Sequence, residues 1–106
     1  MKILVCCDHG NNRSVHFAHR LKYWNNDVLA AGLDKNSQTT LRMLCEWADL
    51  IIITEESQKY KVHAEFDPKI KLFDVGPDTY PRPFNDELLA KVKEFLEDNK
   101  ELLKNA

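Results

Sequence analysis

Hydrophobic residues along the chain fall into four short, nearly continuous runs that are separated by longer stretches of mixed polarity. Successive positions within these runs are mostly apolar, whereas a half-exposed strand would alternate apolar and polar residues. Runs of this kind are typical of strands that are buried on both faces of a parallel sheet. The sequence therefore predicts four strands, at Lys2–Cys6, Val28–Ala31, Leu50–Ile53 and Ile70–Phe73.

The stretches after these runs carry apolar residues at intervals of three and four, which predicts amphipathic helices. In the first stretch, Phe17, Leu21 and Trp24 recur at this spacing. The final helix is the longest, and we expect its tail from Glu101 to fray. The first predicted helix spans Ser14–Asn25, and the second runs from the N-cap Ser37 through Leu41 to Ala48. The third runs from Thr54 to about Phe66, where Asp67 and Pro68 end it, and the last runs from Phe84 to Leu96.

Strand and helix alternate four times, which is typical of an α/β fold. We predict a single domain over residues 1–106, built on a four-stranded parallel sheet with helices on both faces. In such sheets, ligands bind beyond the carboxyl ends of the strands, where the strand order reverses. The loop from Cys7 to Asn12 and the loop from Asp74 to Pro83 both follow predicted strands, and we expect them at that edge.

Composition narrows the class of function. The 106 residues are 43% hydrophobic and carry a formal net charge of −2, so we expect a globular core and no basic field for nucleic acid. No run approaches the roughly 20 apolar residues of a membrane span, and no signal peptide is recognised. Three cysteines, two of them adjacent, argue against a disulfide framework. The sequence predicts a cytoplasmic protein without nucleic-acid or membrane partners and leaves its oligomeric state open.

The candidate chemistry lies in the loop between the first strand and the first helix, where five residues separate Cys7 from Arg13. The backbone N–H groups of such a loop can surround one oxyanion, and the following helix directs its positive end to the same point. An arginine can hold two phosphate oxygens, and a thiol placed there is favoured as the reactive thiolate. The predicted phosphate-binding residues are Asp8, His9, Gly10, Asn11, Asn12, Arg13 and Ser14.

Other titratable residues receive structural interpretations. Cys45 lies on the apolar stripe of the second helix, and we assign it to the core. His16 and His19 are three residues apart on a helix, but no third ligand has matching spacing, so we expect neither a metal site nor a cofactor. Lys59 and Lys61 are expected to be solvated.

Four segments of the chain together form a recognisable pattern: Cys7-(x5)-Arg13-Ser14, Ala30–Gly32, Trp47–Thr54 and Gly76–Tyr80. This pattern resembles that of the low-molecular-weight protein tyrosine phosphatases. The resemblance covers nearly the whole chain and is strongest to a short subgroup of predicted tyrosine phosphatases. It implies the Rossmann-like phosphotyrosine phosphatase type I fold.

The resemblance implies a metal-independent phosphatase mechanism. Cys7 would attack phosphorus and form a cysteinyl-phosphate intermediate, while Arg13 and the loop amides hold the equatorial oxygens. Ser14 would stabilise the thiolate through a hydrogen bond. Asp78 would protonate the leaving oxygen and then activate water. The expected partner is a phosphorylated protein or a small phosphomonoester.

Two of the assigned roles have alternatives within the late loop. Asp78 could instead form a turn beside Pro77, in which case Asp74 is the rival general acid. Tyr80 could line the substrate slot or simply cover the loop.

The family usually carries apolar side chains where this chain has Asp8 and Asn11, so the resemblance implies phosphomonoester chemistry more directly than tyrosine specificity.

Three other functions fit parts of the pattern. The Cys7-Asp8-His9-Gly10 run also resembles the phosphocysteine loop of sugar-transport IIB carriers, which lack the arginine found here at position 13. An arsenate reductase shares the fold and the loop, but its chemistry usually needs further cysteines, and only Cys45 lies away from the loop. A non-catalytic module that binds a phosphorylated partner is the third. Arg13 and Asp78 favour hydrolysis over the carrier.

Overall fold

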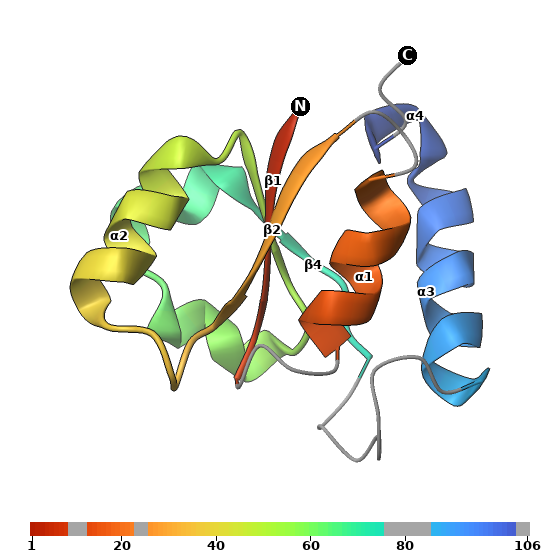
Figure 1. Cartoon of the computed structure of the whole chain (residues 1–106), viewed down its shortest axis with the longest axis horizontal. Coiled ribbons are helices and arrows are strands. Elements are labelled where there is room, and N and C mark those ends of the chain that lie inside the picture. The colour runs from red at the N-terminus through yellow and green to blue at the C-terminus, as the bar shows by residue number, and fades with distance from the viewer. Residues whose placement is uncertain (9–12, 23–25, 76–85, 104–106) are drawn as a thin grey trace.

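The computed structural model describes residues 1–8, 13–22, 26–75 and 86–103, and they form a layered α/β structure around one sheet (Figure 1). Four strands pair in parallel in the order β2-β1-β3-β4. The predicted parallel sheet is therefore confirmed, with β1 in its interior. The strands are β1 (Lys2–Cys7), β2 (Asp27–Gly32), β3 (Leu50–Ile53) and β4 (Ile70–Leu72).

Helices cover both faces of the sheet (Figure 1). The side chains of β1 alternate between the two layers. Ile3 and Val5 pack on the side of α1 and α3, while Leu4 and Cys6 pack on the side of α2. All four are fully buried, which explains the continuous apolar run in the sequence. The helices are α1 (Arg13–Lys22), α2 (Gln38–Trp47), α3 (Asp86–Asp98) and α4 (Lys100–Leu103), with two 3₁₀ helices, η1 (Glu56–Lys61) and η2 (Ala64–Lys69).

The predicted helix from Thr54 to Phe66 is wrong: the two 3₁₀ helices η1 and η2 take its place. Val62 and His63 have non-helical backbone, with ψ angles of 137° and 136°, and interrupt the helical path. This break lets Val62 and Phe66 both enter the core beneath α2. Pro68 lies inside η2 rather than after a helix. Short 3₁₀ segments suit this connection because a proline, which lacks an N–H, disrupts the interior of an α-helix.

The described part of the tail from Glu101 is helical and packed, contrary to the expected fraying, while residues 104–106 lie outside the described residues. Leu103 is fully buried in the core between α1 and α3. The side-chain amide of Asn26 donates hydrogen bonds to the carbonyl oxygens of Leu21 (3.3 Å) and Leu103 (2.6 Å). One buried amide thus ties the end of α1 to α4. The predicted helix limits at Asn25 and Phe84 lie outside the described residues.

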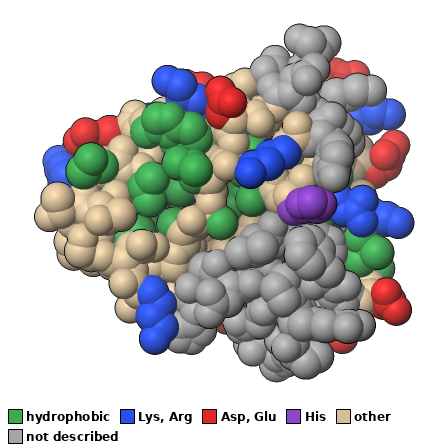
Figure 2. All heavy atoms as spheres, in the orientation of Figure 1, with side chains coloured by type: hydrophobic (Ala, Val, Ile, Leu, Met, Phe, Trp, Pro, Cys, Tyr) green, Lys and Arg blue, Asp and Glu red, His purple; other side chains and the backbone are tan. Residues whose placement is uncertain are grey.

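The surface carries charges of both signs around a hydrophobic region. Figure 2 shows hydrophobic side chains gathered over α2 and β2, with acidic and basic side chains around them. Leu29 of β2 and Met43 of α2 are 44% and 66% exposed. Within the described part of the chain, no helix is long and apolar enough to cross a bilayer.

The docked tail generates a stability prediction. Leu103→Ala should lower the free energy of unfolding by about 2–4 kcal/mol, because it leaves a cavity in the core. Leu102→Ala is the matched control: Leu102 is 47% exposed, and its truncation should cost less than about 0.5 kcal/mol. Urea unfolding followed by circular dichroism measures both. Equal effects for the two variants would show that the tail contributes no buried packing.

Candidate functional site

The candidate site lies where the strand order reverses. The chain runs from β1 to β2 on one side and then crosses to β3 on the other, so β1 and β3 flank the switch point. Cys7 ends β1 and Thr54 follows β3 directly. The two strand ends are joined, since the Thr54 hydroxyl donates a hydrogen bond to the Cys6 carbonyl oxygen at 3.0 Å. This is the edge at which open parallel sheets bind ligands.

Cys7 faces the first turn of α1. Its Sγ lies 3.0 Å from Ser14 Oγ, and both residues are fully buried. A serine hydroxyl at this distance can donate to a thiolate, and the N-terminal end of α1 favours negative charge there. Cys6 points to the opposite face of the sheet, as the alternation predicts. Burial raises the pKa of the Cys6 thiol far above its ordinary value, with Cys45 and Cys7 adding to the shift, so Cys6 is a packing residue.

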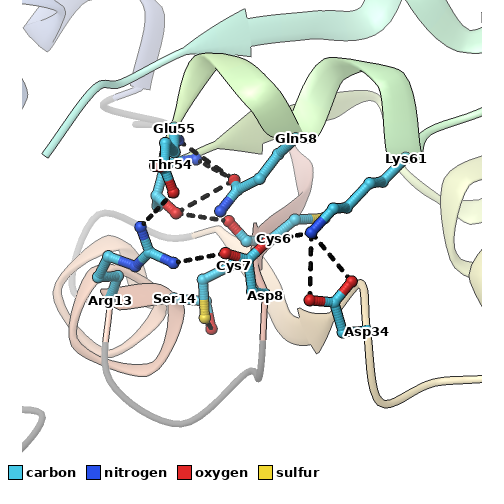
Figure 3. Close-up of polar contacts among 10 residues, drawn as sticks. All are labelled: Cys6, Cys7, Asp8, Arg13, Ser14, Asp34, Thr54, Glu55, Gln58 and Lys61. Carbon is cyan, nitrogen blue, oxygen red and sulfur yellow. Dashed lines mark hydrogen bonds and ion pairs between the residues drawn. The ribbon is translucent and has the colours of Figure 1, made fainter. Parts of the chain in front are cut away.

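Arg13, the first residue of α1, is buried together with its charge. Its side chain has no exposed surface, and its guanidinium contacts two carboxylates (Figure 3). Nη1 donates to Glu55 Oε2 at 3.1 Å, and Nη2 donates to Asp8 Oδ2 at 3.3 Å. Since a buried charge is tolerated only when it is paired, these contacts are what keep the guanidinium at the switch point. Arg13 is therefore not an ordinary surface arginine.

Glu55 is held in place by Gln58, a fully buried residue of η1. Gln58 Oε1 accepts hydrogen bonds from the backbone N–H groups of Thr54 (2.8 Å) and Glu55 (3.2 Å) and from the Thr54 hydroxyl (3.2 Å). The sequence pattern did not predict the pairing of Glu55 with Arg13. The detectable signal is the capping box formed by Glu55 and Gln58, directly after a buried strand.

Lys61 is exposed, as predicted, and it also joins the site through two aspartates, which the sequence did not predict. Its Nζ donates to Asp8 Oδ1 at 2.8 Å and to Asp34 Oδ2 at 3.1 Å (Figure 3). We call these three residues the Asp8–Lys61–Asp34 bridge. Partial burial alone would raise the pKa of Asp8, but Lys61 and Arg13 together hold it below its ordinary value. The hydrogen bonds to Asp8 and Asp34 raise the pKa of Lys61.

A pocket of ≈ 570 Å³ lies beside this bridge, between the segment after β2 and the two 3₁₀ helices. Its charged lining includes Lys59 and Lys61 as well as Asp34 and Asp67, so the signs balance. A phosphate dianion needs a convergence of positive groups and backbone dipoles. The balanced charge of this pocket does not provide that convergence.

The segment after β4 leaves the sheet beside the site. Phe73 N–H donates to the Ile53 carbonyl at 2.8 Å, and Val75 N–H donates to the Thr54 carbonyl at 3.0 Å. The Phe73 ring packs edge-on against Phe17 of α1, with 4.7 Å between the ring centroids. These contacts place Asp74, which is exposed, at the same sheet edge as Thr54.

Several residues predicted for the site lie outside the described part of the chain. Cys7, Asp8, Arg13 and Ser14 are brought together by the structure, whereas the middle of the loop and the late loop are not described. The described residues contain no group of three His, Cys, Asp or Glu side chains suited to a metal ion. The predicted site residues outside the described ranges are His9, Gly10, Asn11, Asn12, Asp78 and Tyr80.

Comparison with known proteins identifies structural neighbours without a close relative in sequence. No family model and no curated protein matches the chain. Wzb of Vibrio vulnificus, solved in complex with benzylphosphonate, superposes with a TM-score of 0.69 at 20% identity, covering 97% of each chain. The tyrosine phosphatase Wzb from Escherichia coli K30 gives TM-scores of 0.63 with phosphate and 0.62 with sulphate, at 21% identity over 95% of this chain and 94% of that one. The expected fold of the low-molecular-weight tyrosine phosphatases is confirmed.

The ionised Asp8 carboxylate generates a prediction on pH. Because the folded state lowers the pKa of Asp8, its contribution is present above the unfolded pKa of about 3.9 and is lost as pH falls through the folded value. Asp8→Asn should lower the free energy of unfolding by about 1 kcal/mol at pH 6, and this difference from wild type should vanish at low pH.

Urea unfolding between pH 6 and pH 2.5 measures this difference. Asp27→Asn, at an exposed position of β2, is the control and should stay close to wild type throughout. A difference between Asp8→Asn and wild type that stays constant over this range would contradict the assigned ion pairs.

Proposed function

We propose that this chain is a cysteine-dependent phosphomonoester hydrolase of the tyrosine phosphatase type. The observation that carries the proposal is the juxtaposition of Cys7 and Ser14, 3.0 Å apart, with the buried guanidinium of Arg13 at the N-terminus of α1. A nucleophile, a donor to its thiolate and a phosphate-binding cation meet at the switch point of the sheet. The fold shared with a tyrosine phosphatase solved with phosphate supports the same reaction.

The proposed reaction has two steps. The Cys7 thiolate attacks phosphorus, the bond from phosphorus to the leaving oxygen breaks, and Asp78 gives its proton to that oxygen. Water then attacks the cysteinyl phosphate and transfers a proton to Asp78. The bond from sulfur to phosphorus breaks, which releases inorganic phosphate and restores the thiolate. The loop amides and Arg13 stabilise the phosphoryl oxygens in both transition states.

The described residues support preorganisation of this site. Glu55 fixes the plane of the Arg13 guanidinium from one side, and Gln58 fixes the backbone of Glu55. Hydrogen-bond donors that are already oriented toward the transition state need no rearrangement during the reaction. Such donors account for much of the rate enhancement in many enzymes. Arginine suits the role because its planar fork can hold oxygens bidentately while it remains charged.

The substrate class we propose is an aryl phosphate, carried by a protein or by a small molecule. The V. vulnificus neighbour was solved with benzylphosphonate, in which a phosphonate group sits one carbon from an aromatic ring. We further propose a reducing, cytoplasmic compartment, which suits three buried cysteines that form no disulfide.

The arsenate reductase alternative is disfavoured by the positions of the other thiols. Such a relay needs a second cysteine that can reach the nucleophile. Cys6 points to the opposite face of the sheet, and Cys45 of α2 is 3% exposed in that same layer. Burial raises the pKa of Cys45, although Lys69 opposes the shift. Neither thiol is placed to relay a disulfide to Cys7.

The nucleophile assignment is tested by substitution. The wild-type protein should hydrolyse p-nitrophenyl phosphate in the presence of EDTA, and orthovanadate should inhibit it. Cys7→Ser should lower kcat by more than about 1,000-fold, because an alcohol at this position is a far weaker nucleophile than a thiolate. Cys45→Ser is the control and should keep most of the activity if the protein folds. Equal activity in Cys7→Ser and wild type would refute the assignment, and a stable phosphocysteine in wild type would favour the carrier.

The general acid is tested with two leaving groups. Asp78→Ala should slow hydrolysis of phenyl phosphate about 100-fold more than that of p-nitrophenyl phosphate, because phenol leaves poorly without a proton. Asp74→Ala is the matched variant from the same segment and should slow both substrates equally and little. The reverse pattern, with Asp74→Ala sensitive to the leaving group, would transfer the role to Asp74.

A further inference from the structure

The first residue after the nucleophile carries a carboxylate, and the sheet places a second carboxylate next to it. The Leu33 N–H donates to the Cys7 carbonyl and the Asp34 N–H donates to the Asp8 carbonyl, both at 2.8 Å. The chain that leaves β2 therefore continues alongside the beginning of the phosphate loop. Two like charges held side by side in this way repel each other and need a cation between them.

Lys61 supplies that cation from a third segment, the end of η1. Its ammonium contacts Asp8 Oδ1 at 2.8 Å and Asp34 Oδ1 at 3.0 Å. The other oxygen of Asp8, Oδ2, accepts from Nη2 of Arg13 at 3.3 Å. Asp8 therefore divides its two oxygens between Lys61 and Arg13, and Lys61 acts on Arg13 through this one carboxylate (Figure 3).

The contact of one Asp8 oxygen with Lys61 is important because of the net charge around Arg13. Among the described residues, the charged groups that face Asp8 are Arg13 of α1, Lys61 of η1 and Asp34 after β2, and Glu55 joins through Arg13. Together with Asp8, these described groups comprise two positive and three negative charges, which leaves one net negative charge beside a loop that must accept a phosphate dianion. Without Lys61, the net charge would be two negative units, and both oxygens of Asp8 could bind the guanidinium bidentately.

We propose that Lys61 is a positioning residue of the phosphate loop, which keeps Asp8 from occupying Arg13 bidentately and thereby leaves the guanidinium able to bind an oxyanion. The proposal rests on the proposed function of this loop. The ionised forms that it needs are the stable ones near neutral pH, because the ion pairs lower the pKa of Asp8 and raise the pKa of Lys61.

The test compares Lys61→Met with Lys59→Met, a matched change of charge at an exposed position of the same 3₁₀ helix. The affinity for orthovanadate, measured by calorimetry, and kcat/KM for p-nitrophenyl phosphate are the two readouts. Lys61→Met should weaken vanadate binding and lower kcat/KM by about five- to tenfold. Lys59→Met should leave both unchanged, and Lys61→Arg should restore most of the loss.

The same substitution made in the Asp8→Asn variant shows whether Lys61 acts through Asp8. Asp8→Asn should bind vanadate at least as tightly as wild type, because the competing carboxylate is gone. In that background, Lys61→Met should weaken vanadate binding little further, since the effects of substitutions at coupled residues are not additive. An equal loss in both backgrounds would overturn the proposal, and so would equal behaviour of Lys61→Met and Lys59→Met. Circular dichroism verifies folding, and Lys61→Gln replaces Lys61→Met if the latter does not fold.

The two readouts separate this proposal from the proposed function. Vanadate binding requires no turnover. If wild type binds vanadate without hydrolysing any phosphomonoester, and Lys61→Met still weakens binding through Asp8, the hydrolase proposal fails and the positioning role stands. If wild type hydrolyses p-nitrophenyl phosphate and Lys61→Met matches Lys59→Met, the positioning role fails and the hydrolase proposal stands.

Discussion

The buried guanidinium of Arg13 is the constraint on which the candidate site depends. A charge with no exposed surface is stable only if its partners come with it, and those partners are Asp8 after β1 and Glu55 after β3. Each of these carboxylates ties the guanidinium to a different strand end, so α1, Asp8 after β1 and the exit from β3 are fixed relative to one another. The side-chain amide of Gln58 extends this constraint to η1. The functional edge of the sheet is thus one connected unit.

The features that the sequence predicts correctly are those whose cause is local. Four apolar runs predict the strands because burial on both faces removes polar residues from every position. The spacing from Cys7 to Arg13 and Ser14 predicts their meeting because one short loop joins β1 to α1. Cys6 and Cys45 are in the core, as their positions in the pattern indicate.

The features that escape prediction depend on contacts between distant parts of the chain. Lys61 and Asp8 are 53 positions apart, and Glu55 and Arg13 are 42 apart. Nothing next to Lys61 in the sequence distinguishes it from the exposed Lys59. Likewise, the apolar pattern around Val62 and Phe66 fits one helix as well as two 3₁₀ helices, and only the core beneath α2 decides between them. The docking of Leu103 follows from a similar long-range contact with Asn26.

The alternation of side chains along β1 also determines how Cys7 would react with oxidants. Vicinal cysteines that project to opposite faces of a sheet cannot come together as a disulfide without breaking the strand. A sulfenic acid formed on Cys7 would have no resolving thiol, because Cys6 and Cys45 both lie in the other layer and the chain has no fourth cysteine. Reversible protection of Cys7 would then have to come from a small-molecule thiol or a backbone nitrogen. The geometry that keeps Cys7 separate from the other thiols removes an intramolecular disulfide as a route of protection.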